Sequence, residues 1–173
     1  MDLLQRFAHG EMDAFETLVR QFQGDIYAWT VRIVRDPGVA EDLTVEALWR
    51  VFCTRHRFRP DGNFGAWARR IATNLAIDYL RRNRPEQSFP AEPAGAPQAD
   101  PLVQREIQER IQQAFRRLPA KLQVAATLAL VEEVPYDEIA SALGTSVGAV
   151  KLRVFRAVRI LRKRLSQAGI RPE

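Results

Sequence analysis

The chain has 173 residues, of which 46% are hydrophobic, and a formal net charge of +5. This composition predicts a folded protein of one or two domains and excludes global disorder. A single cysteine excludes an intramolecular disulfide, and neither a signal peptide nor an apolar run long enough to span a membrane is present. We therefore expect a basic protein of the cytoplasm.

A proline-rich segment divides the chain. Residues 85–102 hold five of the ten prolines, together with three acids and no base. Proline interrupts helices, and a segment of this composition buries little apolar surface. We therefore expect a flexible linker over residues 85–102 between two domains, residues 1–84 and residues 103–173.

The first domain is predicted to be helical, because its apolar residues recur at helical spacing and no segment alternates like a strand. Asp13–Glu16 has the spacing of a capping box, and Asp36–Pro37 suits an N-cap followed by a first-turn proline. Residues 59–63 are dense in turn formers, which predicts a loop. A further helix is expected over about 64–82.

The second domain shows the same periodicity, with helices opening at residues 100–101 and at Pro119 and an interruption at residues 133–135. Gly144 then suits a turn with positive φ, and Ser146 suits the N-cap of the last helix. This spacing predicts a helix-turn-helix. The expected fold class is all-α, with two small helical bundles joined by the linker.

The last helix has the charge of a polyanion-binding element. Residues 146–164 contain seven Lys or Arg residues and no acid. Opposite its valine stripe, small residues would let the helix approach a major groove, Arg156 could read guanine and Phe155 could contact a thymine methyl. The alternative is a solvated basic helix on which Phe155 packs against a neighbouring element.

The first domain is polarised in charge. Residues 1–49 contain nine acids and four bases, whereas residues 50–84 contain nine bases and two acids. An acidic and a basic surface on one domain indicate two different partners.

The predicted helix over residues 64–82 carries a polar stripe about 100° from its apolar one. An aromatic ring beside guanidinium groups suits single-stranded nucleic acid, and the loop over residues 58–64 could hold a flipped base. The alternative is that Trp67, Phe58 and Phe64 belong to the core, which we favour for Phe64. The stripe consists of Trp67, Arg70, Asn74, Asp78 and Arg81.

Enzymatic and metal chemistry have no support in the sequence. Cys53 and His56 are two possible ligands only, so we expect no metal site and interpret Cys53 as a small buried hydrophobe. We find no phosphate-binding glycine loop and no nucleophile with a histidine partner, so we expect neither a cofactor nor catalytic residues.

Taken together in this order, the motifs resemble the extracytoplasmic-function (ECF) sigma factors of bacterial RNA polymerase over about residues 11–168. In the first domain the resemblance is carried by Asp13–Glu16, Asp36–Pro37, Ala40–Leu43, Phe64–Leu75 and Asp78–Arg82. In the second domain it is carried by Leu118–Pro119, Tyr136–Ala140, Leu143–Gly144, Ser146–Lys151 and Arg153.

The resemblance implies that residues 1–84 are sigma region 2 and residues 103–173 are sigma region 4. The implied contacts to the clamp helices of the polymerase β′ subunit are Asp42, Leu43, Glu46 and Trp49. The implied minus-ten contacts are Phe58, Arg59, Asp61, Asn63, Phe64, Trp67, Arg70, Asn74, Asp78 and Arg81. The implied minus-thirty-five contacts are Ser146, Gly148, Ala149, Lys151, Leu152, Arg153, Phe155 and Arg156.

The same resemblance implies contact with the β flap tip, duplex and single-stranded promoter DNA, and an anti-sigma factor as partners. Two residues depart from the family pattern: Val45 stands where Gln is frequent, and Leu152 stands where Ser or Thr is frequent. Two other functions stay open at this point. The chain could be a stand-alone helix-turn-helix regulator, or a sigma-like module that sequesters a regulator.

Overall fold

The structure, a computed structural model, describes residues 1–84 and 101–170. Nearly all of the predicted linker lies outside these ranges. Every regular element in the two described ranges is a helix, which confirms the all-α prediction. No helix within them is both long and apolar enough to cross a membrane.

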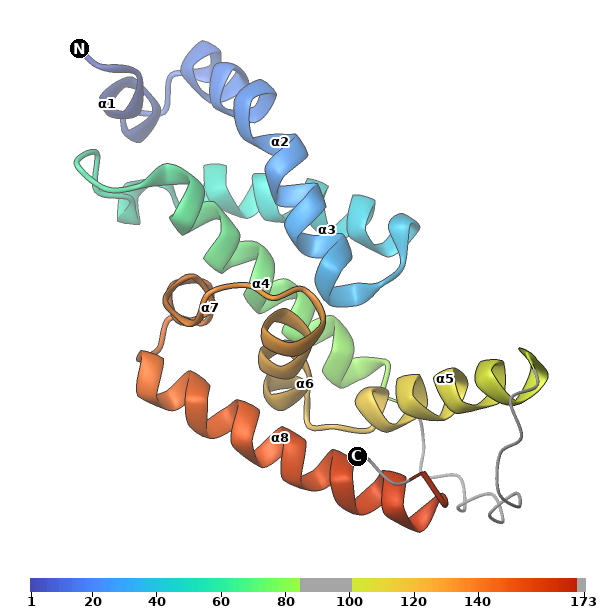
Figure 1. The fold of residues 1–173 in the computed structure, drawn as a ribbon. Helices are drawn as coiled ribbons and strands as arrows, with labels where there is room; N and C mark the ends of the chain where they lie inside the picture. The colour runs from blue at the N-terminus through green and yellow to red at the C-terminus, as the bar shows by residue number, and fades with distance from the viewer. Residues whose placement is uncertain (85–100, 171–173) are drawn as a thin grey trace.

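The N-terminal half is built from four α-helices (Figure 1). They are α1 (Leu3–Ala8), α2 (Met12–Val34), α3 (Pro37–Cys53) and α4 (Phe64–Arg82), with a 3-10 turn, η1 (Arg55–Arg57), after α3. The Asp36 carboxylate accepts a hydrogen bond from the Val39 N–H at 3.1 Å, as its predicted N-cap role requires.

The predicted capping box at Asp13–Glu16 is wrong. The helix α2 has Glu11 as its N-cap, and Asp13 lies inside the first turn, where its carboxylate pairs with Arg6 of α1. A capping box does exist at the start of α1, between Asp2 and Gln5. Sequence spacing could not show that Arg6 would fold back onto Asp13.

The C-terminal half contains α5 (Pro101–Arg116), α6 (Ala120–Ala126), a π-helical turn η2 (Thr127–Val131), α7 (Tyr136–Leu143) and α8 (Val147–Gln167). Gly144 has φ 63° between α7 and α8, and the Ser146 hydroxyl accepts a hydrogen bond from the Ala149 N–H at 3.1 Å. These two features form the predicted helix-turn-helix.

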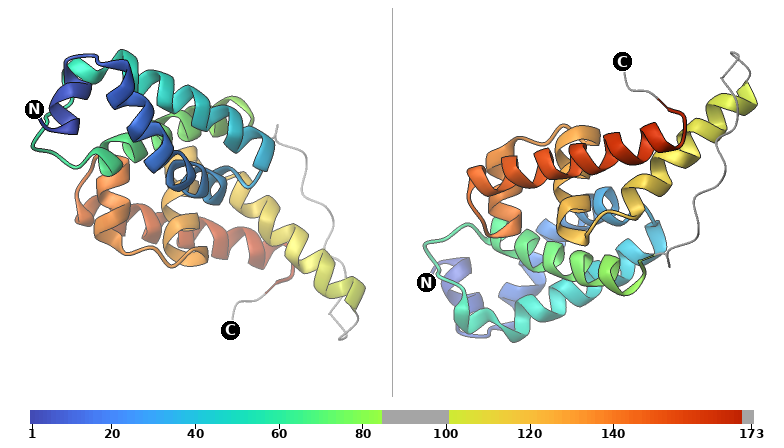
Figure 2. Two further views of the ribbon diagram at one scale, coloured as in Figure 1. Left: turned by 90° about the horizontal axis from the view of Figure 1, so that it is seen from above. Right: turned by 90° about the horizontal axis from the view of Figure 1, so that it is seen from below.

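The two halves pack against each other, whereas the sequence led us to expect separate bundles. Helix α4 contacts α6 and α7, and α2 contacts η2 (Figures 1 and 2). One continuous cluster of buried apolar residues runs from Phe7 in α1 to Val154 in α8. This shared core places the helix-turn-helix directly beside the polar stripe of α4.

Candidate nucleic-acid interface

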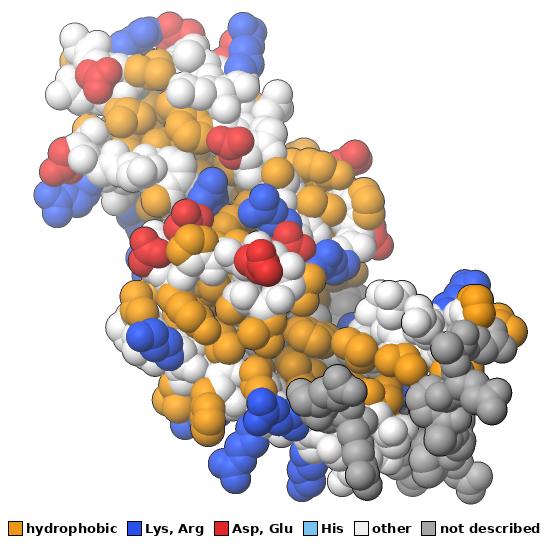
Figure 3. All heavy atoms as spheres, viewed as in Figure 1, with side chains coloured by type: hydrophobic (Ala, Val, Ile, Leu, Met, Phe, Trp, Pro, Cys, Tyr) orange, Lys and Arg blue, Asp and Glu red, His pale blue; other side chains and the backbone are white. Residues whose placement is uncertain are grey.

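The outer face of α8 is basic and open to solvent. Val150, Val154 and Leu161 are buried toward the C-terminal half, while cations project from the opposite side (Figure 3). Lys151 and Arg156 are two of these exposed cations, and neither makes an ion pair with an acid within the described ranges. Their charge is therefore available to an external polyanion.

Two apolar side chains stand among these cations. Phe155 is 64% exposed and Leu152 is 47% exposed, and their spacing of three places them on one helix face. The alternative in which Phe155 packs against a neighbour is therefore wrong. Val147, the first residue of α8, is exposed as well, although it continues the valine stripe of this helix.

The remaining minus-thirty-five candidates lie on the first two turns of α8 or just before them. Ser146 and Gly148 are exposed, and Ala149 and Arg153 are half-buried. Ser146 is the N-cap of α8, and its hydroxyl oxygen already accepts a hydrogen bond from the Ala149 N–H.

Aromatic rings fill the end of the N-terminal half where α1 meets the loop before α4. Phe58 and Phe64 are buried beside Phe7, with the Phe58 and Phe64 ring centroids 6.0 and 5.4 Å from that of Phe7. The DNA contacts that the resemblance implied for Phe58 and Phe64 are therefore corrected, since both rings support the loop from beneath. The core position favoured for Phe64 is confirmed. Trp67 packs on Phe58, with 5.1 Å between ring centroids, but stays half-buried.

The exposed part of Trp67 lines a small pocket of about 230 Å³ between α3 and α4. The structure brings together here two predicted residues, Trp67 and Asn74, with two arginines that our predictions missed. The pocket is lined by Arg50, Thr54, Arg57, Trp67, Ile71 and Asn74. The excess of bases over residues 50–84 was the available signal for these arginines.

In the polar stripe of α4, Asn74, Asp78 and Arg81 are open to solvent, whereas Trp67 is half-buried. Asp78 Oδ1 lies 3.8 Å from Arg81 Nη1, so the carboxylate partly offsets the positive charge of this guanidinium. In the preceding loop Arg59 pairs with Asp61 at 3.1 Å. Asn63 caps α4, because its Oδ1 accepts a hydrogen bond from the Ala66 N–H at 2.9 Å.

Helix α3 presents a second, separate surface. Asp42, Glu46 and Trp49 lie on its outer face, where Trp49 is 63% exposed and Val45 is 69% exposed. Leu43, predicted to contact the polymerase, is instead buried in the core, because it lies about 100° around the helix from Asp42. An exposed tryptophan flanked by acids is typical of a protein-binding surface.

Cys53 is exposed at the end of α3, so the prediction of a buried hydrophobe is wrong. It is the last residue of α3 and does not belong to the buried face of that helix. In the described ranges no group of three His, Cys, Asp or Glu side chains could hold a metal ion.

Comparison with known proteins decides the family. The family model for sigma-70 region 2 matches residues 18–86, and that for sigma-70 region 4 matches residues 108–161. The chain is also 31% identical to the ECF RNA polymerase sigma factor SigW of Bacillus subtilis, over 94% of both chains. The chain belongs to the ECF sigma factors of RNA polymerase.

The fold of this sigma factor agrees with two solved structures. CnrH in complex with the cytosolic domain of CnrY has a TM-score of 0.59 at 23% identity, with 95% of each chain covered. The sigma factor RpoE of Bartonella quintana, in complex with the anti-sigma factor NepR, has a TM-score of 0.53 at 21% identity, with 88% and 96% covered. The two structures thus share the overall fold of this sigma factor, and the family models identify its regions 2 and 4.

Proposed function

We propose that the two exposed basic surfaces of this sigma factor divide promoter recognition between them. The outer face of α8 reads the minus-thirty-five element as duplex, and the polar stripe of α4 with its pocket holds the non-template strand of the minus-ten element. The observation that carries the proposal is the α8 face, where unpaired cations surround the exposed Leu152 and Phe155.

On α8, Gly148 and Ala149 allow close approach to the groove, and Lys151, Arg153 and Arg156 contact phosphates or guanine edges. Leu152 cannot donate a hydrogen bond, so with Phe155 it supplies apolar contact to thymine methyl groups. The minus-thirty-five preference of this chain therefore differs from that of relatives with a hydroxyl at this position.

On α4, Trp67 and Asn74 line the small pocket, and Arg50 and Arg57 supply positive charge around it. A ring that is half-buried is rigid and still offers one face for stacking, which suits a base of a separated strand. Arg59, Asp61, Arg70, Asp78 and Arg81 flank this path.

The outer face of α3, with Asp42, Glu46 and Trp49, is the proposed contact to the clamp helices of β′. Val45 adds apolar area where a hydrogen-bonding residue is frequent in the family. The helices before α8 are the proposed contact to the β flap tip. The protein thus acts in the cytoplasm as a dissociable specificity subunit and has no catalysis of its own.

An anti-sigma factor completes the proposal. Support comes from the Bartonella quintana relative, whose structure contains the anti-sigma factor NepR. When such a partner is anchored in a membrane, it would hold the sigma factor nearby, and release would bring the sigma factor to the nucleoid.

The proposal is tested by mixing the purified chain with bacterial core polymerase and a pool of upstream fragments from its own genome, then sequencing the transcripts. Discrete start sites that share two spaced motifs are expected. Polymerase binding without specific transcripts would instead indicate a sequestering module, and no polymerase binding would indicate a stand-alone regulator.

A further inference from the structure

Phe7 of α1 contacts the aromatic residues at the start of α4 and in the loop before it. Its side chain is completely buried, although α1 has only six residues. Its ring centroid lies 6.0 Å from that of Phe58, 5.4 Å from that of Phe64 and 6.4 Å from that of Trp67. One ring of α1 thus supports both the loop and the first turn of α4.

Phe7 has no exposed surface through which it could touch DNA itself. Helix α1 also precedes residues 18–86, the range that the region 2 family model matches. Figure 1 shows α1 at the end of the N-terminal half where the loop before α4 also lies. Any effect of Phe7 on promoter binding must therefore pass through the side chains on which it packs.

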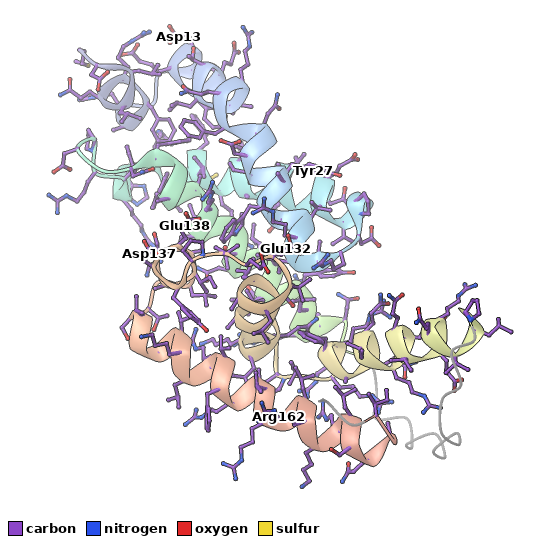
Figure 4. The ribbon with its side chains drawn as sticks, in the orientation of Figure 1. Asp13, Tyr27, Glu132, Asp137, Glu138 and Arg162 are labelled. Carbon is purple, nitrogen blue, oxygen red and sulfur yellow. The ribbon has the colours of Figure 1, made fainter. Side chains whose placement is uncertain are left out.

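Polar contacts hold α1 in this position. Arg6 Nε lies 2.8 Å from Glu11 Oε2, and the Arg6 guanidinium also pairs with Asp13 at the start of α2 (Figure 4). Gly10 turns the chain between α1 and α2 with a φ of 89°, and a Cβ at this position would lie 2.9 Å from Arg55 Nε. The turn packs directly against η1, so α1 is fixed both to α2 and to the segment that leads into the loop.

Trp67 has one packed side and one open side. On the packed side it meets Phe7 and Phe58, with 5.1 Å between the Trp67 and Phe58 ring centroids. On the open side it lines the pocket of about 230 Å³ together with Arg50 and Asn74. The side chain has two rotatable bonds, so its packed neighbours determine whether the indole keeps the orientation that borders the pocket.

The Phe7 ring fills space on the packed side of Trp67. A large-to-small substitution in a core leaves a cavity into which the surrounding side chains partly relax. Phe58 and Phe64 are buried, whereas Trp67 is half-buried and borders open space on its other side. Without the Phe7 ring, the indole can therefore move inward and leave the pocket.

We propose that Phe7 is a positioning residue for the minus-ten element, because it holds the Trp67 ring at the surface, oriented to stack on a base of the separated strand. The inference rests on the proposed function of Trp67. Stacking on an aromatic side chain strengthens binding by about 5- to 150-fold per base. Ordering a side chain upon binding costs about two- to tenfold in affinity, and Phe7 provides this order in advance.

The test measures which base of the promoter depends on Phe7. The full chain is combined with core polymerase, and affinity is measured for premelted fragments of a promoter found by transcript sequencing, with one minus-ten base at a time replaced by an abasic site. In the wild type, the position that stacks on Trp67 should lose about tenfold in affinity, and Trp67→Ala should remove this loss. Phe7→Ala should reduce the loss to about twofold and leave the losses at the other positions unchanged.

Two control variants separate positioning from stability. Phe7→Leu keeps most of the buried volume and should retain the loss of about tenfold. Ile33→Ala also opens a cavity in the core, but Ile33 lies at the other end of α2 from Phe15, which stacks on Phe7, about 27 Å away along the helix. It should destabilise the chain and leave every abasic loss as in the wild type. If Phe7→Ala fails to fold, Phe7→Val opens a smaller cavity beside the same indole and is measured instead.

An abasic loss at the Trp67-dependent position that is the same in Phe7→Ala as in the wild type would overturn the positioning role. An equal reduction of that loss in Ile33→Ala would overturn it as well, because the effect would then follow from stability alone. Both outcomes leave the proposed function of Trp67 intact. If no position depends on Trp67, or if polymerase with this chain binds no promoter, the proposed function fails and the inference fails with it.

Discussion

At the residue scale, backbone conformation limits substitution most clearly at Gly144. Its φ of 63° is a conformation that L side chains rarely adopt, and it turns the chain from α7 into α8. By contrast, Gly24 lies inside α2 with nothing within 4 Å of a Cβ added there. The two glycines therefore make a matched pair.

We predict that Gly144→Ala lowers the free energy of unfolding by about 1 kcal/mol, because of the left-handed backbone. Gly24→Ala should raise it by about 0.5–1 kcal/mol, because alanine is the better helix former. Urea unfolding of both variants measures the difference. Equal effects of the same sign would contradict the assigned backbone roles.

Arg6 links α1 to α2 through Glu11 at 2.8 Å and through Asp13. Its hydrogen bond holds the pKa of the Asp13 carboxyl below the usual range. The stabilisation from Asp13 is therefore complete above the ordinary carboxyl pKa and is lost as the pH falls through the lowered one. An NMR titration should show this lowered pKa, and Arg6→Gln should return it toward the ordinary value.

Residue types showed which side chains could bind DNA, but their burial depends on contacts far apart in the chain. Phe58 and Leu43 were assigned to partners and are core residues, because α1 and α2 close over them. Phe64 was named among the implied minus-ten contacts although the core was favoured for it, and it is buried. Cys53 was assigned to the core and is exposed. Phe58 and Leu43 each lie next to an exposed residue, and both neighbours of Cys53 are half-buried, so the sequence neighbours do not indicate the burial of these residues.

At the element scale, helix boundaries were largely predictable because capping chemistry is local. Asp36, Pro119 and Ser146 begin helices where the sequence indicates, and α4 spans the predicted residues 64–82. The pocket between α3 and α4 could not be predicted, because it depends on how two helices cross. Arg50 and Arg57 therefore joined the candidate site only with the structure.

Separate elements should give separable defects. Arg156→Ala should weaken binding of duplex minus-thirty-five DNA by about 1–3 kcal/mol, whereas Trp67→Ala should spare that binding and impair promoter opening. Filter binding and permanganate footprinting measure the two steps. Equal losses of closed-complex binding in both variants would contradict the division between α8 and α4.

The apolar contact of α8 can be tested through the base it touches. Replacing thymine by uracil in the minus-thirty-five element removes only a methyl group, which should weaken binding about fourfold. The Leu152→Ser variant should respond less to this replacement than the wild type. A wild type that binds both duplexes equally would exclude methyl recognition by Leu152 and Phe155.

At the scale of the whole molecule, the sequence indicated two halves but not their docking. The buried apolar residues of α4, α6, α7 and α8 belong to one cluster that spans both halves, and Ile77 of α4, at 5% exposure, is one of them. The groove of about 820 Å³ between α2, α4, α5 and η2 exists for the same reason, because it needs both halves in place. Long-range packing of this kind leaves no periodic signal.

The shared core predicts cooperative unfolding of the two halves. Calorimetry of the wild-type chain should show one transition, and Ile77→Asp should resolve it into two, since each half then unfolds alone. Ile77→Val, which keeps the apolar contact, should retain a single transition. Two transitions in the wild type would show that the halves are energetically independent.

The packing of the two halves also has a genetic consequence at Glu132, whose carboxylate lies 2.6 Å from Arg35 Nη2 and 3.6 Å from Arg32 Nε of α2. One ion-pair bridge thus joins positions about 100 residues apart in the chain. Second-site mutations that suppress a defect of Glu132→Arg should therefore be charge reversals at positions 32 and 35, far from the first mutation on the linear map of the gene.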